Sequence, residues 1–379
     1  DVSNNTLLRS LSTRNTSQLT ALDVSNNTLL TQLWCHDNSL TTLDVSNNTL
    51  LENLMCNNNQ LIHLNMKNGV THQLTNFKAK NNSLDCIEVN AENVDWATAN
   101  WTYANDNIDA GVEFSVECVP EGYTNVPDDN FEQALIDLGY DNVLDNYVLT
   151  ENISGLTSLT VGDKDIVDLT GIEAFTSLTS LDCRFNDLTS LDVSSIPGLT
   201  YLDFASNQLT SIDLSNNTSL EYLYAQNNQL TSMDLGTTSS LIHIYYNYNQ
   251  LPSLDLSANT GLIKIECTDN GITSLDVSDL TALEELNCYQ NELSSLDVSN
   301  NTSLTYLSCF TNQLTTLDVS SNTALTSLDI HDNSLTSLDV SANTALTYLS
   351  CYDNQLTSLD VSANTALTEL NCFVNQLTS

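Results

Sequence analysis

The chain has 379 residues and carries 48 acidic residues against 8 lysines and arginines, a formal net charge of -40. Such a surface repels the phosphates of nucleic acids and of anionic membranes, so neither is an expected partner. No stretch approaches the ~20 apolar residues of a membrane span, so we expect no membrane insertion. Hydrophobic residues make up 41% of the chain and recur at regular positions, which argues against disorder.

A 21-residue unit organises the sequence, and residues 346–366 show it most clearly as LTYLSCYDNQLTSLDVSANTA. A constant step repeated this often indicates one supersecondary unit stacked on itself, and each unit needs its neighbours to bury its apolar face. The frame LxxLxCxxNxL followed by TxLDVSxNTx resembles a leucine-rich repeat. We expect a repeat solenoid with a parallel β-sheet on its concave face and irregular segments or short 3-10 helices on its convex side. The unit begins at Leu199, Leu220, Leu241, Leu262, Leu283, Leu304, Leu325, Leu346 and Leu367.

Residues 1–84 are predicted to form a first array of imperfect repeats, because the frame starts at Leu8, Leu30, Leu51 and Leu74. This array begins in mid-repeat, so we expect it to be truncated at its N-terminus.

Residues 85–118 break the frame and are predicted to form a C-terminal cap for the first array. They hold Trp96 and Trp101, whose bulk would cover the apolar end of the last coil, and they are bracketed by Cys86 and Cys118. Terminal repeats need such a cap to stay soluble. A Cys86–Cys118 disulfide would stabilise the cap by ~3 kcal/mol; the alternative is two buried free thiols.

A second array with its own cap is predicted after a linker at 119–125. In the segment 126–155, Pro127 opens a helix, and the acidic residues that follow it stabilise the N-terminal end of the helix dipole. A helix directly before a repeat array is typical of an N-terminal cap. The segment 156–379 then repeats in near-perfect register and stops in mid-repeat, so we expect truncation at its C-terminus. The predicted architecture is two tandem curved solenoids with caps.

Two columns are predicted to be structural. The asparagine at position 9 of the frame should turn inward and satisfy backbone groups, since an unpaired buried polar group costs ~1–3 kcal/mol. The cysteines at position 6 should form a ladder of reduced, buried thiols, because stacked parallel side chains fit poorly with a disulfide. No CxxC pair supports zinc.

A column of aspartates recurs in the LDVS part of nine consecutive repeats. Neighbouring carboxylates would lie ~5 Å apart, so either each accepts backbone N–H groups in a turn or cations lie between them. Calcium is therefore the one candidate cofactor. The column consists of Asp192, Asp213, Asp234, Asp255, Asp276, Asp297, Asp318, Asp339 and Asp360.

The frame leaves positions 3, 5, 7 and 8 free, and in the second array these carry an aromatic stripe. Exposed aromatics in a stripe indicate a contact surface, and tyrosine is favoured at interfaces. The alternative is that the rings only stabilise the sheet by stacking across strands. We expect the centre at Tyr222, Tyr224, Tyr245 and Tyr248. The stripe consists of Tyr201, Tyr222, Tyr224, Tyr245, Tyr248, Tyr289, Tyr306, Phe310, Tyr348, Tyr352 and Phe373.

Catalysis is not expected. The five histidines are scattered, and no Ser/His/Asp or Cys/His set converges. Carboxylates such as Glu266, Asp269 and Glu285 lack a pocket that would shift their pKa values.

The unit LTSLDVSxNTxLTxLxCxxNQ closely resembles the repeats of cysteine-ladder internalins and of secreted leucine-rich repeat proteins of Bacteroidetes. This resemblance implies an exported or cell-surface protein used in adhesion, matrix contact or glycan binding. We therefore expect an extracellular binding scaffold for a protein or glycoprotein. The alternatives are a polysaccharide-binding module, or a structural spacer or filament subunit that self-associates by end-to-end stacking.

Overall fold

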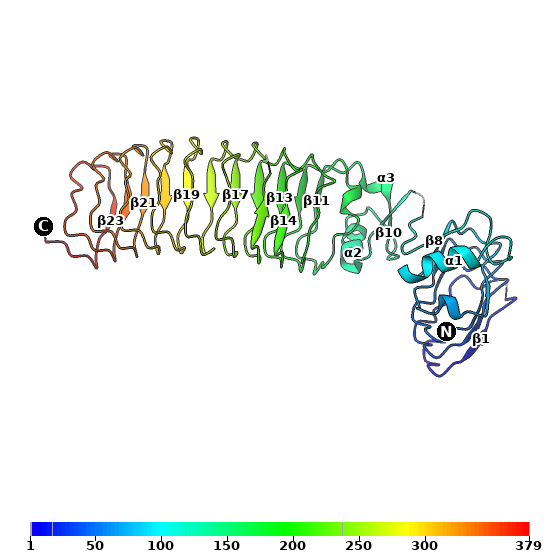
Figure 1. Cartoon of the computed structure of the whole chain (residues 1–379). Helices are drawn as coiled ribbons and strands as arrows, with labels where there is room; N and C mark the ends of the chain where they lie inside the picture. The colour runs from blue at the N-terminus through cyan, green and yellow to red at the C-terminus, as the bar shows by residue number, and fades with distance from the viewer. Residues whose placement is uncertain (1, 17, 121, 237, 379) are drawn as a thin grey trace. The chain divides into compact units, whose positions relative to one another are not determined.

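The computed structural model describes residues 2–16, 18–120, 122–236 and 238–378, and it consists mainly of short parallel strands stacked repeat upon repeat (Figure 1). Contacts divide the chain into two compact units, Asp1–Tyr123 (unit 1) and Thr124–Ser379 (unit 2). Each unit is a solenoid of parallel-strand coils joined by turns. The predicted repeat solenoid is therefore confirmed. Among the described residues, no helix is long and apolar enough to cross a membrane.

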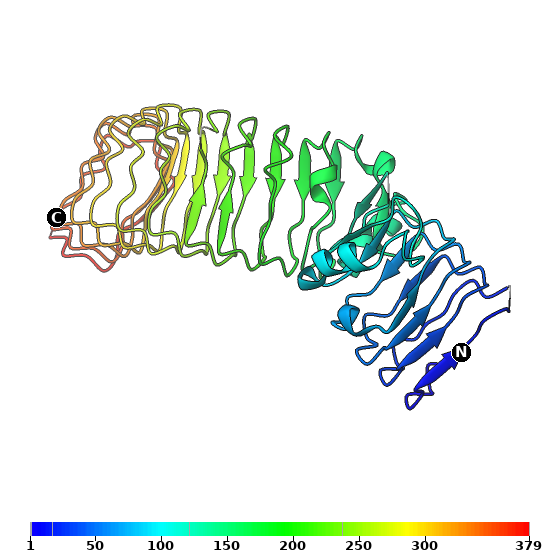
Figure 2. The ribbon, with the colours of Figure 1, turned by 45° about the vertical axis from the view of Figure 1, so that its right-hand side comes forward.

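Unit 1 contains two four-stranded parallel sheets, whose short strands run from blue to cyan in Figure 2. The pairing follows the uneven repeat: Ser10 lies opposite Gln32, Gln32 opposite Asn53, and Asn53 opposite Asn76. Extra residues are absorbed between strands and leave the pairing intact. One sheet has the order β1 (Ser10–Ser12), β2 (Gln32–Trp34), β4 (Asn53–Met55), β6 (Asn76–Lys78), and the other β3 (Thr42–Asp44), β5 (His63–Asn65), β7 (Cys86–Glu88), β8 (Glu113–Ser115).

The end of unit 1 is closed by aromatic packing and by a disulfide. Trp101 is buried, and its ring centroid lies 4.2 Å from that of Phe77 and 5.8 Å from that of Phe114. Cys86 and Cys118 are joined in a disulfide with their Cα atoms 5.5 Å apart. The helical elements of unit 1 are η1 (Thr71–Gln73), η2 (Ala91–Asn93) and α1 (Val94–Asn100).

Unit 2 begins with a small helical module. The Asp128 side chain caps α2 (Asp129–Asp137) by accepting from the N–H groups of Asn130 and Phe131, and its other oxygen accepts from Val167 N–H at 2.9 Å. This second bond ties the helix to the first coil. Phe131 is buried in the core. The buried side of α2 does not reach the end of the helix, because Leu138 at the helix C-cap is 44% exposed.

The remaining elements of unit 2 are regular. Strands β9 (Tyr123–Asn125) and β10 (Tyr147–Leu149) pair, α3 (Thr150–Ile153) and η3 (Ile172–Ala174) follow, and β14 (Ser211–Asp213) pairs with β16 (Ser232–Asp234). An eleven-stranded parallel sheet, the long sheet, runs along the unit. Its order is β11 (Ser158–Thr160), β12 (Ser180–Asp182), β13 (Tyr201–Asp203), β15 (Tyr222–Tyr224), β17 (His243–Tyr245), β18 (Lys264–Glu266), β19 (Glu285–Asn287), β20 (Tyr306–Ser308), β21 (Ser327–Asp329), β22 (Tyr348–Ser350) and β23 (Glu369–Asn371).

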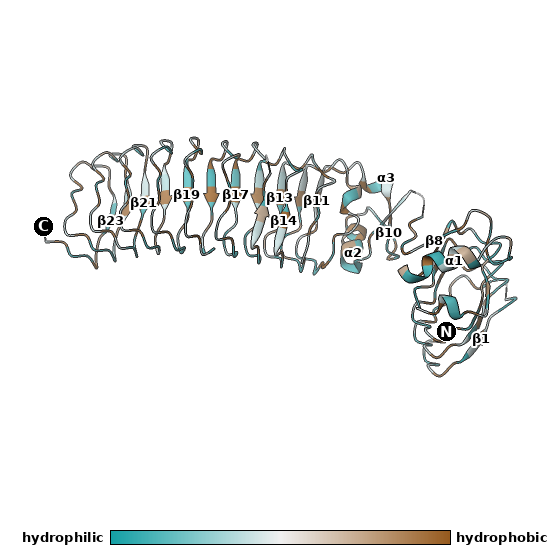
Figure 3. Ribbon diagram, viewed as in Figure 1, coloured by the Kyte–Doolittle hydropathy of each residue, from teal (hydrophilic) through white to brown (hydrophobic). Residues whose placement is uncertain are grey.

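The interior of unit 2 is a stack of identical columns. The central residue of nearly every long-sheet strand is buried, as at Leu307, Leu328 and Leu349, so apolar and polar residues alternate along the strands (Figure 3). Cys288 and Cys309 are buried and unpaired in this core. Burial raises the pKa of Cys309 to about 12, which keeps the thiol protonated.

The asparagine at position 9 connects each coil to the one before it. Asn312 donates through Nδ2 to the carbonyls of Cys288 and Cys309, both at 3.1 Å, and its Oδ1 accepts from Leu293 N–H at 3.0 Å. A second asparagine column, in the SxNT part of the repeat, has the same role: Asn322 donates to Val298 O and Asn301 O. The 21-residue spacing of this second column, at Asn301, Asn322 and Asn343, is the signal in the sequence that predicts it.

Candidate functional site

The outward side of the long sheet, here called the sheet face, is formed by frame positions 3, 5, 7 and 8. Positions 3 and 5 flank the buried central residue of each strand, and positions 7 and 8 follow the strand. Position 8 takes a left-handed backbone in successive coils, with φ of 56° at Tyr248, 50° at Thr311 and 51° at Asp332. All residues of the predicted aromatic stripe lie at these four positions, but they fall into two separate groups and three further side chains.

The first group, here called the tyrosine cluster, consists of Tyr201, Tyr222, Tyr224, His243 and Tyr245 on β13, β15 and β17. The rings of Tyr224 and Tyr245 stack with centroids 4.7 Å apart and an interplanar angle of 8°. Tyr201 lies 5.4 Å from Tyr224 at 41°, and Tyr222 meets His243 edge-on at 5.2 Å. Parallel pairing puts these residues in adjacent coils, since Tyr222 lies opposite both Tyr201 and His243.

The second group, here called the ring ladder, consists of Tyr289, Phe310, His331, Tyr352 and Phe373, all at position 7. Successive centroids lie 4.2, 4.1, 4.2 and 4.3 Å apart, with interplanar angles between 7° and 14°. The ladder is continuous because an imidazole occupies the middle place. Sequence reasoning treated His331 as one of five scattered histidines. Its spacing of 21 residues from Phe310 and from Tyr352 was the signal that could have placed it.

Three residues of the stripe belong to neither group. Tyr248 is 46% exposed and interacts with Tyr289, whose pKa is raised by burial and then by this contact. Tyr306 and Tyr348 lie at position 3 on β20 and β22, each opposite Ser327. The structure therefore brings Tyr222, Tyr224 and Tyr245 together and places Tyr248 toward the ring ladder.

The charges beside the tyrosine cluster are balanced locally. Lys264 Nζ lies 3.1 Å from Glu266 and 2.9 Å from Glu285, and it sits 5.4 Å above the centroid of Tyr245. Desolvation lowers the pKa of Lys264, but the hydrogen bonds to Glu285 and Glu266 raise it overall. Two of the carboxylates considered for catalysis are thus bridged by an ammonium group.

The side chains next to His331 in the ring ladder are acidic. Asp329 Oδ1 lies 2.6 Å from His331 Nδ1, and Asp332 Oδ2 lies 3.9 Å from His331 Nε2. Asp353 occupies the position of Asp332 in the next coil, and a hydrogen bond with Asp332 raises the pKa of Asp353. No lysine or arginine follows Lys264 in the sequence.

The aspartate column lies at the other end of each coil and forms turns. Asp297 Oδ1 accepts from Ser299 N–H at 2.9 Å, and Asp318 and Asp339 accept in the same way from Ser320 and Ser341. Hydrogen bonds from Ser299 lower the pKa of Asp297. One oxygen of each carboxylate is therefore used by the backbone. Within the described residues, no group of three or more His, Cys, Asp or Glu residues is arranged to hold a metal ion.

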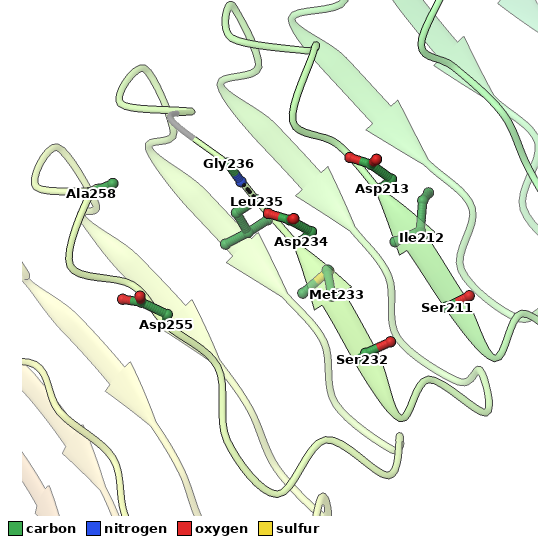
Figure 4. A pocket seen from close by; sticks show the side chains of 10 residues that line it. All are labelled: Ser211, Ile212, Asp213, Ser232, Met233, Asp234, Leu235, Gly236, Asp255 and Ala258. Atoms are coloured by element: carbon green, nitrogen blue, oxygen red, sulfur yellow. Dashed lines mark hydrogen bonds between the residues drawn. The ribbon is translucent and has the colours of Figure 1, made fainter.

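A shallow hollow of about 580 Å³ lies over this column, between successive coils (Figure 4). Asp213, Asp234 and Asp255 line it from successive repeats, with Ser211 and Ser232 below them. A serine needs an adjacent base to act as a nucleophile. The described lining offers only carboxylates engaged in turns, so the hollow has no constellation for acyl or phosphoryl transfer.

Comparison with known proteins places the chain among bacterial leucine-rich repeat proteins. The family model for leucine-rich repeats (2 copies) matches residues 197–237. Internalin J of Listeria monocytogenes is 40% identical over 68 residues, which are 18% of this chain and 7% of that protein.

Two solved structures extend the likeness over about two thirds of the chain. The functional domain of InlJ from L. monocytogenes, which includes a cysteine ladder, is 33% identical with a TM-score of 0.60; the match covers 68% of this chain and 63% of that one. The internalin InlF from L. monocytogenes is 26% identical with a TM-score of 0.63, covering 67% and 77%. With its 21-residue repeat, its cysteine column and these relatives, the chain is a bacterial internalin-like leucine-rich repeat protein.

Proposed function

We propose that this protein is a non-enzymatic extracellular binding scaffold that holds a protein or glycoprotein partner on the sheet face of unit 2. The observation that carries the proposal is the separation of roles within each coil. Leucine, cysteine and asparagine columns face inward and maintain the stack, whereas the outward positions 3, 5, 7 and 8 carry rings and unbalanced charge. Rigid aromatic groups on a solvent-facing sheet supply contact area at a low entropic cost.

The internalin-like relatives support the class of function, and the structure supports its location. The hollow over the aspartate column is lined mainly by residues of β14 and β16 and by aspartates whose carboxylates are engaged in turns, whereas the sheet face presents half-buried rings along most of its coils. A surface-exposed or secreted protein is consistent with the cell-surface character implied by the internalin resemblance.

Ring geometry makes a polysaccharide partner the weaker alternative. A sugar ring binds an aromatic side chain by stacking on its face. In the ring ladder, each inner ring has both faces covered by its neighbours, as Phe310 is between Tyr289 and His331. Tyr224 and Tyr245 each cover one face of the other. Ring edges and hydroxyl groups are left for a partner, and these suit a protein surface better.

The test is binding of the full chain to an array of purified extracellular and cell-surface proteins, with a glycan array run in parallel. A Tyr222→Ala, Tyr224→Ala, Tyr245→Ala variant changes the sheet face. The matched control replaces Ser299, Ser320 and Ser341 by alanine at the aspartate column, where the backbone N–H groups that bond to the aspartates are retained. We expect a protein ligand that binds the native chain and the control but binds the tyrosine variant at least ~tenfold more weakly.

Two outcomes contradict the proposal. Selective loss of a glycan signal in the tyrosine variant would support the polysaccharide alternative. Unchanged binding of every protein by the tyrosine variant would exclude this part of the sheet face as the binding surface.

A further inference from the structure

Asp203 is a buried carboxylate on the outward side of the long sheet. It occupies position 5 on β13, and its side chain is 3% exposed, whereas the side chains of Glu266 and Asp329 at the same position of later coils are 24% and 17% exposed. One oxygen, Oδ1, accepts from the N–H group of Ala205 at 3.0 Å. A buried charge is costly unless it is paired, so its other oxygen needs partners as well.

The second oxygen of Asp203 meets a hydroxyl group and a guanidinium group. Oδ2 accepts from the Tyr201 hydroxyl at 3.4 Å and lies 3.6 Å from Arg184 Nη1. Arg184 Nε lies 3.4 Å from Asp182 Oδ2, and Asp182 is opposite Asp203 in the sheet. Arg184 therefore bridges the carboxylates of two adjacent coils at one end of the tyrosine cluster, as Lys264 bridges two glutamates at the other end.

The direction of the Tyr201 ring follows from its bond to Asp203. Strand pairing puts Tyr201 opposite Tyr222 and puts Asp203 opposite Tyr224. The Tyr201 ring nevertheless meets the ring of Tyr224, with centroids 5.4 Å apart at 41°. Because its hydroxyl reaches the residue two positions further along its own strand, Tyr201 leans along β13 and comes against the ring that faces Asp203. The bond thus joins Tyr201 to the stacked pair of Tyr224 and Tyr245.

We propose that Asp203 is a positioning residue of the binding surface, which holds the Tyr201 ring against Tyr224 and so orders the tyrosine cluster for its protein partner. This inference rests on the proposed function and adds a regulation by pH to the same site. An ionised carboxylate is a stronger acceptor than a neutral one and pairs with Arg184. Protonation of Asp203 therefore loosens Tyr201, and the partner binds less tightly in acid.

The surroundings of Asp203 separate a role in binding from a role in stability. Burial is the main cause that raises the pKa of Asp203; the Ala205 N–H group and Arg184 act against it. A carboxyl group whose pKa is raised on folding stabilises the fold in its protonated form, and this contribution is lost as pH rises through the folded pKa. Near neutral pH, the ionised side chain adds no such stability. The titratable and charged groups around it are Asp182, Cys183, Arg184, Tyr201 and Tyr224.

The experiment measures the affinity of the full chain for the protein ligand identified on the array, near neutral pH and at decreasing pH. The test variant is Asp203→Ser. Residues 201–203 read Tyr-Leu-Asp, and the chain itself uses Tyr-Leu-Ser at 306–308 and 348–350 of the same sheet, so the coil accepts serine at this position. The control, Asp297→Ser, removes one carboxylate from the aspartate column, where a serine hydroxyl also forms the turn. Tyr201→Phe removes the hydroxyl and keeps the ring.

We expect Asp203→Ser to bind the ligand ~fivefold more weakly near neutral pH and the control to change affinity by less than ~twofold. The urea midpoint of Asp203→Ser should equal or exceed that of the native chain. In the Tyr201→Phe background, Asp203→Ser should add no further loss, because both substitutions remove the same contact. The difference between the native chain and Asp203→Ser should shrink in acid, where the native side chain is neutral too.

Three binding results would overturn the proposal: no loss for Asp203→Ser, an equal loss for Asp203→Ser in the native and Tyr201→Phe backgrounds, or a difference that persists unchanged in acid. Any of these, with a ligand that still requires Tyr222, Tyr224 and Tyr245, would leave the proposed function standing. Near-ultraviolet circular dichroism without ligand tests the positioning separately. Asp203→Ser should weaken the tyrosine signal and the control should not; an unchanged signal would overturn the positioning role even if every ligand failed to bind.

Discussion

The tyrosine cluster and the ring ladder lie on the same sheet, yet they differ in order and in charge. In the cluster, ring planes meet at 8°, 41° and 90°, and Lys264 is held between two glutamates nearby. In the ladder, every successive pair is within 14° of parallel, and the neighbouring acids have no lysine or arginine downstream. The repeat fixes the position of each outward side chain. The residue types nearby decide how the rings pack and whether acidic side chains have a cationic partner within the protein.

The largest expected effect comes from removing the support beneath the ladder. Asn312→Ala deletes two donors and one acceptor that serve the backbone of two coils, so it should lower the free energy of unfolding by ~2–4 kcal/mol. The measurement is urea unfolding followed by tyrosine fluorescence. Asn300→Ala is the control, because Asn300 makes one exposed bond, to Ser278 O. A similar loss of unfolding free energy in the control would mean that the inward asparagine column stabilises the coils no more than an exposed asparagine does.

The counter-ion of the tyrosine cluster gives the next effect. Lys264→Met leaves Glu266 and Glu285 side by side without a cation, so we expect a loss of ~1 kcal/mol near neutral pH. Because the pKa of Lys264 is raised on folding, its own contribution is fully present below the unfolded pKa and disappears only as pH rises through the folded pKa. Urea midpoints across pH measure this, and a loss independent of pH would contradict it.

Much of the fold could be predicted from the sequence because one period controls every inward position. A leucine, cysteine or asparagine repeated every 21 residues must meet the same neighbours in each coil, so its environment follows from counting. The outward positions do not obey this rule, since nothing buried restricts them. The place of His331 in the ladder was not predicted, because the histidines were considered only as catalytic residues. An imidazole is also a flat ring that can stack between two aromatic side chains.

Backbone geometry explains the other limit of the prediction. Tyr248 shares the outward side with Tyr245, and alternation along the sequence did not separate them. Its left-handed backbone, with φ of 56°, places it after the strand and toward Tyr289. Asp332 and Asp353 take the same left-handed backbone at position 8, and no spacing in the sequence indicates a left-handed residue there.

The left-handed backbone at position 8 also predicts a substitution that stabilises the coils of the ring ladder. Thr311 has φ of 50°, which is costly for a β-branched residue. Thr311→Asn should raise the free energy of unfolding by ~1 kcal/mol by relieving this strain. Gln290→Asn in the preceding coil should give a smaller gain, because glutamine is not β-branched. An unchanged or lower urea midpoint for Thr311→Asn would contradict the strain at this position.

The smallest effect concerns the middle ring of the ladder. His331→Phe keeps a flat ring between Phe310 and Tyr352, so stability should change by less than ~0.5 kcal/mol, whereas His331→Ser should cost ~1 kcal/mol more by interrupting the stack. Near-ultraviolet circular dichroism reports the stacking directly. Equal spectra for the two variants would show that the ladder does not act as a continuous stack.

The central claim, that the outward side of the long sheet is the binding surface, is tested most directly by titration. A protein ligand identified on the array is titrated against the immobilised native chain, the Tyr222→Ala, Tyr224→Ala, Tyr245→Ala variant and the Ser299→Ala, Ser320→Ala, Ser341→Ala control. We predict that the native chain and the control bind the ligand equally, and that the tyrosine variant binds it at least ~tenfold more weakly. A ligand that binds all three chains equally would contradict the account.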